Sequence, residues 1–343
     1  MSQSRLSLFG ALCVAAALTA CGGGGGGSAP TPTPAPAPTP SPSPSPSPAP
    51  APSTLVTSVA PFSYPSNPDL AKAMEYLNAA RGSCGFGLLA QNTKLDQAAN
   101  DQALYLTQNA GLGRAVDHTQ VPSYPGYTAL TAGDRAQYRG YGSTNVSEGD
   151  TLSPIGGIRP MTDIVALMGV TYHMQNAFGT FREVGFSVVS DPTQASSWIA
   201  GVTNYGTVGA DQQPAGNSIS SYPCEGTTVA VGGHGPETPD PIPGRDWIAR
   251  PGGTPILFQV RTGQVLAITS FTLKDQAGAI VPIAATLTSA SDPNKFIRPH
   301  QAVVIPDSML TRGATYFVEA SGTNNGQPWT QKFKFSVAAA APN

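Results

Sequence analysis

Apolar side chains recur at helical spacing through the middle of the chain, from about residue 68 to residue 174. In "NPDLAKAMEYLNAARGSCG", Leu70, Met74 and Leu77 fall on one helical face, Asn67 is a candidate N-cap, and Gly82 favours a stop. The same spacing predicts further helices over about 92–111, 134–139 and 162–174. Strands are predicted to follow over about 183–189, 198–204 and 227–231.

Apolar and polar residues alternate in the last third of the chain. Phe333, Phe335 and Val337 alternate with polar residues, which is the pattern of a half-buried strand. Further strands are predicted over about 257–260, 265–273, 302–305 and 316–320. About seven short strands in roughly 95 residues predict an all-β sandwich over residues 245–338. The ending "LTRGATYFVEASG…WTQKFKFSV" resembles bacterial Ig-like modules, which implies a spacing or binding role.

A Gly/Pro-rich stretch, "GGHGPETPDPIPGR", predicts a linker over residues 233–244. It separates the sandwich from a mixed helix-and-strand domain at residues 63–232. His234 lies in this stretch without ligand-type neighbours, so we expect it to be solvated. His300 precedes a strand with no partner motif and is expected at the surface.

The N-terminus predicts export and lipid anchoring. Arg5 and the apolar run Leu8 to Leu18 have the form of a signal peptide over residues 1–20. The run ends in Leu-Thr-Ala-Cys, which resembles the bacterial lipobox, and this predicts that Cys21 carries the lipid. The alternative is an ordinary signal peptide with an incidental cysteine. Gly22 replaces the Asp that commonly retains lipoproteins in the inner membrane, so a bacterial outer-membrane or cell-surface location is favoured.

A low-complexity stalk is predicted over residues 21–62. Residues 22–27 are six glycines, and proline alternates with Thr, Ala or Ser from Pro30 to Pro52. No apolar face exists there to offset the entropy of ordering. At roughly 3.1 Å per residue, the proline repeat extends about 70 Å as a polyproline II rod.

Charge and cysteine usage narrow the possible partners. Only 11% of residues are charged, the net charge is −2, and no basic cluster is present, so nucleic acid is not an expected partner. Once Cys13 leaves with the signal peptide and Cys21 is lipidated, Cys84 and Cys224 remain in an oxidising compartment. They are expected to form a disulfide, and the alternative is two free buried thiols.

Residues in the first domain resemble the CAP superfamily of secreted proteins over about residues 63–232. The order and spacing of about fifteen positions carry the resemblance: Leu77-Asn78, Arg81, Gly85, Leu89, Asn92, Leu95, Ala98-Ala99, Ala103, His118, Arg135, Gly140-Tyr141, Glu148, Met168, His173 and Val184-Gly185. The resemblance implies an α-β-α sandwich with a His/Glu cleft. The predicted fold class is therefore α+β, a CAP-type α-β-α sandwich followed by an all-β Ig-like sandwich.

The resemblance places three residues in that cleft. His118 matches the first cleft histidine, Glu148 the glutamate of a Gly-Glu-Asn pattern, and His173 the histidine that ends a Trp-Met-x-Ser-x-x-His pattern. Animal members carry a second glutamate on the helix before the last histidine. Here Asp163 is the only acidic residue of that helix, so the tetrad is incomplete in the sequence.

The chemistry of His118, Glu148 and His173 leaves several functions open. Two imidazoles and a carboxylate suit zinc or another divalent metal with an open position, or a general acid/base pair. Neither a Gly-x-Ser-x-Gly nor a His-Glu-x-x-His motif occurs. The favoured function is a non-enzymatic module that binds a lipid, sterol, glycan or protein, and the alternative is a secreted hydrolase. The structural alternatives are a polar trio that holds loops, and a His173 that interacts only with C-terminal helix carbonyls.

We expect Cys21→Ser to convert a membrane-associated protein into a soluble exported one. The reason is that the lipid on Cys21 is the only membrane-inserting feature predicted to survive processing, and each buried CH₂ contributes about 0.8 kcal/mol. Membrane fractionation of cells that express each form checks this. A serine variant that still sediments with membranes would contradict the lipobox assignment.

Overall fold

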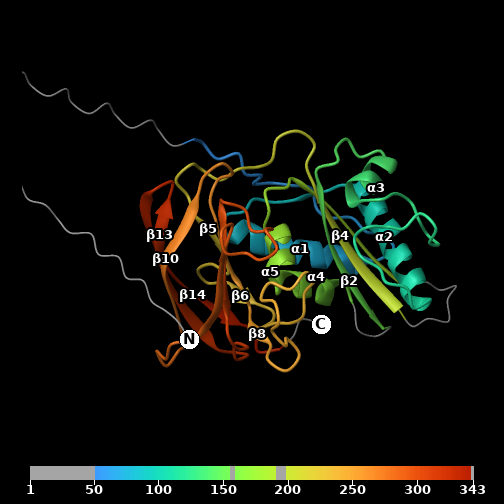
Figure 1. The fold of residues 1–343 in the computed structure, drawn as a ribbon. Coiled ribbons are helices and arrows are strands. Elements are labelled where there is room, and N and C mark those ends of the chain that lie inside the picture. The colour runs from blue at the N-terminus through green and yellow to red at the C-terminus, as the bar shows by residue number, and fades with distance from the viewer. Residues whose placement is uncertain (1–50, 155–158, 191–197, 341–343) are drawn as a thin grey trace, which may run out of the picture. The chain divides into compact units, whose positions relative to one another are not determined.

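The computed structural model describes residues 51–154, 159–190 and 198–340 (Figure 1). The predicted signal peptide, the lipidation site Cys21 and most of the predicted stalk lie outside these residues. No helix among the described residues has the length and apolar character needed to cross a membrane. The protein combines helices and several β-sheets, so its class is mixed α+β.

The N-terminal part of the structure consists of five helices and one four-stranded sheet. The sheet has the order β1-β3-β4-β2; β1 and β3 are parallel, and the other pairs are antiparallel. Its elements are α1 (Pro68–Ser83), β1 (Ala90–Gln91), α2 (Thr93–Gly111), α3 (Ala132–Tyr138), β2 (Val146–Pro154), α4 (Pro160–Met168), α5 (Thr171–Ala177), β3 (Glu183–Ser190) and β4 (Trp198–Gly206).

Helices cover both faces of this sheet. On one face, Ala103 and Leu106 of α2 pack in a cluster with Ala200 and Val202 of β4. On the other face, α1 and α4 contribute apolar side chains to the main core together with β3. Figure 1 shows the resulting three layers, with α2 on one side of β2 and β4 and α1, α4 and α5 on the other.

The helix predicted over about 162–174 is two helices in the structure. α4 ends at Met168 with Gly169 as its C-cap, and the extended Val170 precedes α5. A Cβ atom at Gly169 would lie 3.0 Å from Val231 Cγ2 and 3.3 Å from the Val165 carbonyl oxygen, so a larger residue would crowd this joint. The break places His173 near the start of a helix rather than at the end of one.

The C-terminal part contains two four-stranded sheets that pack against each other. Their orders are β10-β13-β14-β6 and β11-β12-β9-β5. Phe258 of β9 contacts Phe271 of β10 and Phe333 of β14, with ring centroids 6.2 and 6.4 Å apart, so aromatic side chains fill the space between the sheets. The strands are β5 (Ser220–Tyr222), β6 (Thr228–Val229), β9 (Ile256–Gln259), β10 (Leu266–Lys274), β11 (Ile283–Thr288), β12 (Gln301–Pro306), β13 (Thr315–Asn324) and β14 (Gln327–Val337).

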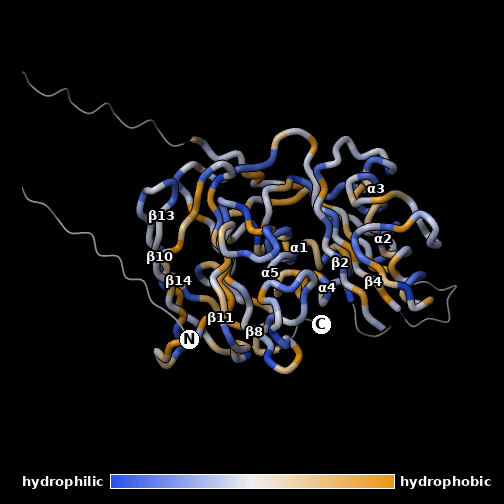
Figure 2. Tube along the Cα trace, viewed as in Figure 1, coloured by the Kyte–Doolittle hydropathy of each residue, from blue (hydrophilic) through white to orange (hydrophobic). Residues whose placement is uncertain are grey.

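Alternate burial along β13 and β14 matches the alternation in the sequence. Tyr316, Val318 and Ala320 of β13 are buried, while the residues between them face outward. In Figure 2, hydrophobic and hydrophilic colours both occur along the strands of this region. The strands predicted over about 265–273, 302–305 and 316–320 are therefore confirmed, with boundaries shifted by a few residues.

The two sheets do not begin at the predicted domain boundary. β5 pairs with β9, and β6 pairs with β14, although both β5 and β6 precede residue 233. The predicted linker is itself ordered, because β7 (Gly233–His234) pairs with β8 (Gly252–Gly253). Residues on both sides of the predicted boundary belong to one compact unit with a shared main core.

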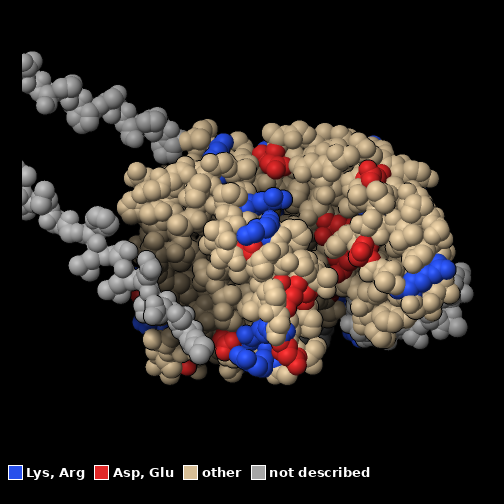
Figure 3. Space-filling view, in the orientation of Figure 1, with Lys and Arg blue, Asp and Glu red and all other residues tan. Residues whose placement is uncertain are grey.

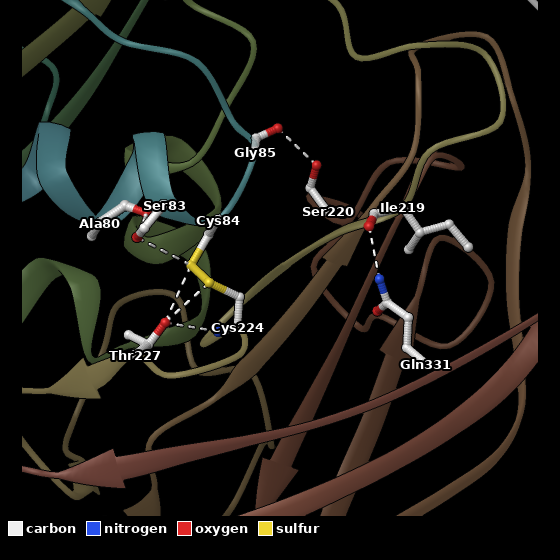
Figure 4. The surroundings of a disulfide bond; sticks show 9 residues. All are labelled: Ala80, Ser83, Cys84, Gly85, Ile219, Ser220, Cys224, Thr227 and Gln331. Atoms are coloured by element: carbon white, nitrogen blue, oxygen red, sulfur yellow. Dashed lines mark hydrogen bonds between the residues drawn. A yellow bond between two sulfur atoms is a disulfide. The ribbon is translucent and has the colours of Figure 1, made fainter.

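The disulfide between Cys84 and Cys224 is confirmed, and it crosses between the two parts of the structure. Cys84 is the C-cap of α1, while Cys224 lies between β5 and β6 (Figure 4). Nearby, the Ser220 hydroxyl donates to the Gly85 carbonyl oxygen at 2.8 Å. The bond closes a separation of 140 residues, which on the chain-entropy model stabilises the fold by roughly 4–5 kcal/mol.

The last residues of the predicted stalk are packed against the folded unit. The Leu88 N–H donates to the Val56 carbonyl oxygen at 2.8 Å, the Thr54 N–H donates to the Gln213 carbonyl oxygen at 2.8 Å, and Phe62 is buried. The stalk prediction, which ran to residue 62, is therefore wrong for these residues. The physical reason is that apolar side chains replace the proline repeat after Pro52 and can bury surface.

A buried carboxyl group joins α4 to the sheet. Asp163 accepts a hydrogen bond from Thr151 of β2, and its second oxygen has no partner among the described residues. A Cβ atom at Gly201 would overlap Asp163 Oδ1, so glycine is required for this approach. Burial raises the pKa of Asp163 to about 7.

We expect Asp163 to make the protein less stable as the pH rises. The folded-state pKa exceeds the unfolded value, so the folded state binds the extra proton between about pH 4 and pH 7. The contribution of Asp163 to the free energy of unfolding should fall by about 1.4 kcal/mol per pH unit over this window and then level off. Asp163→Asn, which keeps the acceptor for Thr151, should reduce the slope by this amount between pH 4 and pH 7 in urea titrations.

Asp69→Asn, at an exposed position in the first turn of α1, is the matched control and should keep the wild-type slope. An unchanged slope in Asp163→Asn would show that other groups carry the pH dependence.

Candidate functional site

A cleft of about 780 Å³ lies between the two parts of the structure. His118, Glu148 and His173 line one side, and Arg298 and His300 line the other. Figure 3 shows that charged side chains are sparse on this face and that uncharged residues cover most of it. The volume is within the range of about 300–1,000 Å³ that is typical of small-ligand sites.

His118 is held by two carboxylates of β2. Its Nδ1 lies 3.2 Å from Glu148 Oε1 and 3.1 Å from Asp150 Oδ2. Glu148 and Asp150 are two residues apart on one strand, so both side chains project from the same face of the sheet. Burial lowers the pKa of His118, but hydrogen bonds to Asp150 and Glu148 outweigh this effect and raise it to about 10. Nearly half of the side chain (48%) is exposed to solvent.

Glu148 is buried and its oxygens are occupied by several donors. Arg135 of α3, itself fully buried, donates Nη2 to both carboxylate oxygens at 2.7 and 2.8 Å. The Asn204 amide, in the orientation that satisfies both of its polar atoms, donates to Oε2 at 3.0 Å. Burial and the Asp150 carboxylate raise the pKa of Glu148, while His118 and Arg135 oppose this effect.

His173 is held by a different carboxylate, that of Glu237. Glu237 Oε1 lies 2.7 Å from His173 Nδ1, and it accepts the backbone N–H groups of Tyr172 and His173 at 2.8 and 3.0 Å. Because a carboxylate only accepts, the His173 ring carries its proton on Nδ1. The alternative in which His173 interacts with C-terminal helix carbonyls is wrong, since His173 is the third residue of α5.

The three residues named from the sequence lie together. The His118 and His173 rings have centroids 6.4 Å apart and are tilted by 40°. Gly149, next to Glu148, lets the His173 ring lie close to β2, because a Cβ atom at this position would be only 3.3 Å from His173 Cδ2. Glu148 contacts His118, whereas Glu237 holds His173, so each imidazole has its own carboxylate partner.

Glu237, the carboxylate partner of His173, comes from the predicted linker. His234 of the same segment is fully buried and stacks on Trp247 at 4.2 Å, so the expectation that it is solvated is wrong. Its Nδ1 donates to the Gly235 carbonyl oxygen at 2.7 Å, and its Nε2 accepts the Thr171 N–H at 3.1 Å. Burial lowers the pKa of His234 and favours this neutral form.

Asp150 is the other site residue that sequence reasoning missed. A signal was available, because Asp150 lies two residues after Glu148 in a stretch that alternates as a strand does. Nothing in the sequence around Glu237 indicates that it belongs to the site, since its partners are 64 and 65 residues away in the chain. Composition alone assigned its segment to a linker.

The donor set does not fit a metal held by His118, Glu148 and His173. Among the described residues, the set of three potential ligand atoms within 4.8 Å is His118, Glu148 and Asp150, and His173 is outside it. Metal ligands must be deprotonated and free to coordinate. Here Arg135 donates to both Glu148 oxygens, and His118 Nδ1 lies between two carboxylates. A cation held by Glu148 would have to displace the contacts from Arg135.

The opposite wall comes from the loop before β12. Arg298 is exposed, and its guanidinium has no side-chain partner among the described residues, while His300 is partly buried. Burial and the positive charge of Arg298 lower the pKa of His300 to about 4, so the ring is neutral at physiological pH. His300, expected as a surface residue without a role, therefore lines the cleft.

Comparisons with known proteins do not assign this chain to a family. No family model matches it, and no curated protein matches it. Among solved structures, it has similarity to an outer surface protein from Borrelia burgdorferi, with a TM-score of 0.32 and 15% sequence identity. The match covers 44% of this chain and 100% of the other. This similarity is too remote to support a function.

We expect Glu237→Ala to destabilise the protein by roughly 3 kcal/mol or more, because three donors lose their acceptor and each buried unpaired donor costs about 1–3 kcal/mol. Glu237→Gln keeps one acceptor oxygen and should lose less than half of that. Urea denaturation monitored by circular dichroism measures both.

Glu75→Ala, at an exposed position on α1, is the control and should change stability by less than about 0.5 kcal/mol. Equal stability of Glu237→Ala and the control would show that the carboxylate does not hold α5.

Proposed function

We propose that this protein is a non-enzymatic binding module whose cleft takes a polar ligand of the glycan type. The proposal rests on the hydrogen bonds that the two imidazoles make and leave unmade. Each Nδ1 is bonded to a carboxylate, and neither Nε2 has a hydrogen-bond partner among the described residues. Two oriented nitrogen atoms at one cleft are suited to holding hydroxyl or carboxylate oxygens of a ligand.

The lining of the cleft favours a polar ligand over a lipid or a sterol. Most of its side chains are hydroxyls, amides, imidazoles or charged groups, and few are aliphatic. A sterol or acyl chain would bury these polar side chains without pairing them, and burying an unpaired polar group costs free energy. A glycan presents many hydroxyls, each a donor and an acceptor, and such a lining can pair with them.

The proposed architecture is a CAP-type domain joined to an Ig-like sandwich and carried by a lipidated stalk. The α-β-α layering and the packed pair of four-stranded sheets support the two domain types. Cys21 would anchor the chain in the bacterial envelope, at the outer membrane or cell surface. The cleft would then meet ligands outside the cell.

A second candidate is a hydrolase that uses the same cleft. The observation in its favour is the His173–Glu237 pair, since an imidazole that donates Nδ1–H to a carboxylate leaves Nε2 able to accept a proton from water. His118 would then stabilise developing negative charge or protonate a leaving group.

One experiment separates the two candidates. The labelled full-length protein is applied to an array of bacterial and plant oligosaccharides, and each bound sugar is then incubated with protein and examined by mass spectrometry. We expect binding with the sugar recovered intact, and at least about tenfold weaker binding for His118→Gln, which loses a charge-assisted contact. Cleavage products that disappear in His173→Gln would favour the hydrolase instead.

Glu319→Gln is the control, because β13 contributes no side chain to the cleft, and it should bind as the wild type does. Elemental analysis of the same preparation tests the divalent metal expected from the sequence. We expect clearly less than one zinc per chain, whereas one bound zinc lost in His118→Gln would support a metal centre.

A further inference from the structure

The wall opposite the histidines is fixed to the helix that carries His173. The Tyr172 hydroxyl donates to Asp292 Oδ1 at 2.5 Å, and Asp292 Oδ2 accepts the N–H groups of Phe296 and Ile297 at 2.6 and 2.8 Å. Gln175 donates to the Phe296 carbonyl oxygen at 2.8 Å. Two side chains of α5 therefore hold the segment that contains Phe296, and the wall is set before any ligand arrives.

This wall presents the Phe296 ring and the Arg298 side chain to the cleft. Phe296 keeps 46% of its surface exposed while it packs edge-on against Tyr172, with centroids 5.3 Å apart and planes at 86°. Two residues later, the Arg298 guanidinium lines the cleft and has no protein partner among the described residues. Arg135 already donates to Glu148, whereas the unpaired guanidinium of Arg298 on a fixed wall is available to a ligand.

The other charged side chains that line the cleft already have partners within the protein. Glu148 is paired with Arg135 and His118, and Asp211 accepts hydrogen bonds from Thr180 and Asn145 at 3.1 and 3.4 Å. Arg298 is the charged side chain of the lining whose guanidinium has no such partner among the described residues. A guanidinium binds a carboxylate, like a phosphate, with two parallel hydrogen bonds.

We propose that the cleft selects oligosaccharides that carry a carboxylate, with Arg298 binding the acid group and Phe296 packing on the apolar face of a sugar ring. This inference rests on the proposed glycan-binding function and adds the class of sugar. The C-terminal part of the chain then forms the wall of the cleft that selects the ligand, and it is not merely a spacer.

Calorimetric titration of the full-length protein tests the inference with two matched probes. Trigalacturonate carries three carboxylates, and α-1,4-galactotriose has the same rings with neutral hydroxymethyl groups. We expect the acidic probe to bind roughly tenfold more tightly than the neutral one. Arg298→Gln should remove that difference by weakening the binding of the acidic probe.

Lys295→Gln is the matched control, because Lys295 is exposed on the same segment and does not line the cleft. It should keep the preference for the acidic probe. Raising the salt concentration should reduce the preference in the wild type and have little effect in Arg298→Gln, since salt screens exposed charges.

The outcomes separate this inference from the proposed function. Equal binding of both probes that is lost in His118→Gln would overturn the acid preference and support glycan binding. No binding of either probe at millimolar concentration would overturn both. Tighter binding of N-acetylated, C-amidated triglutamate, which has three carboxylates and no sugar ring, would overturn the saccharide assignment.

Discussion

The geometry of the cleft depends on one buried carboxylate, that of Glu237. A single oxygen of this side chain accepts two backbone N–H groups at the start of α5 and lies 2.7 Å from the His173 ring nitrogen. Removing a carboxylate from water is expensive unless several donors compensate it. Three donors compensate Oε1, whereas the buried Oε2 has no hydrogen-bond partner among the described residues. The contacts of Oε1 set the direction of the helix and of the imidazole. The position of His173 and the start of α5 therefore cannot vary independently.

The same helix connects the histidine pair to the wall that faces it. Tyr172 and Gln175 of α5 bind the segment around Asp292 and Phe296, while His173 lies between them in the sequence. The disulfide and the pairing of β5 with β9 join the two parts elsewhere. With several independent links of this kind, the distance between the two walls is determined by folding, and ordering the site on binding requires little additional entropy.

Sequence patterns predicted the elements with strong local signals. Local features of the sequence were enough to predict the helices near residues 68–83 and 93–111 and the alternating strands, because hydrophobic period and capping residues lie within each element. The Cys84–Cys224 bond was predicted by counting the cysteines that remain after processing. The break at Gly169 and Val170 was not, since it depends on Glu237, more than 60 residues away. Gly/Pro-rich composition also indicated a linker where the structure has a buried, hydrogen-bonded segment, because composition does not report tertiary contacts.

The two imidazoles of the cleft are supported in different ways, and the difference bears on their roles. His118 lies between Glu148 and Asp150 and is half-exposed, whereas only 14% of the His173 side chain is exposed beside a single carboxylate. Two acceptors favour a proton that stays on the His118 ring, and this histidine is suited to hold oxygen atoms of a ligand as a donor. With its proton on Nδ1 facing Glu237, His173 offers Nε2 as an acceptor. A donor beside an acceptor matches a hydroxyl-bearing ligand, whose oxygen atoms both donate and accept.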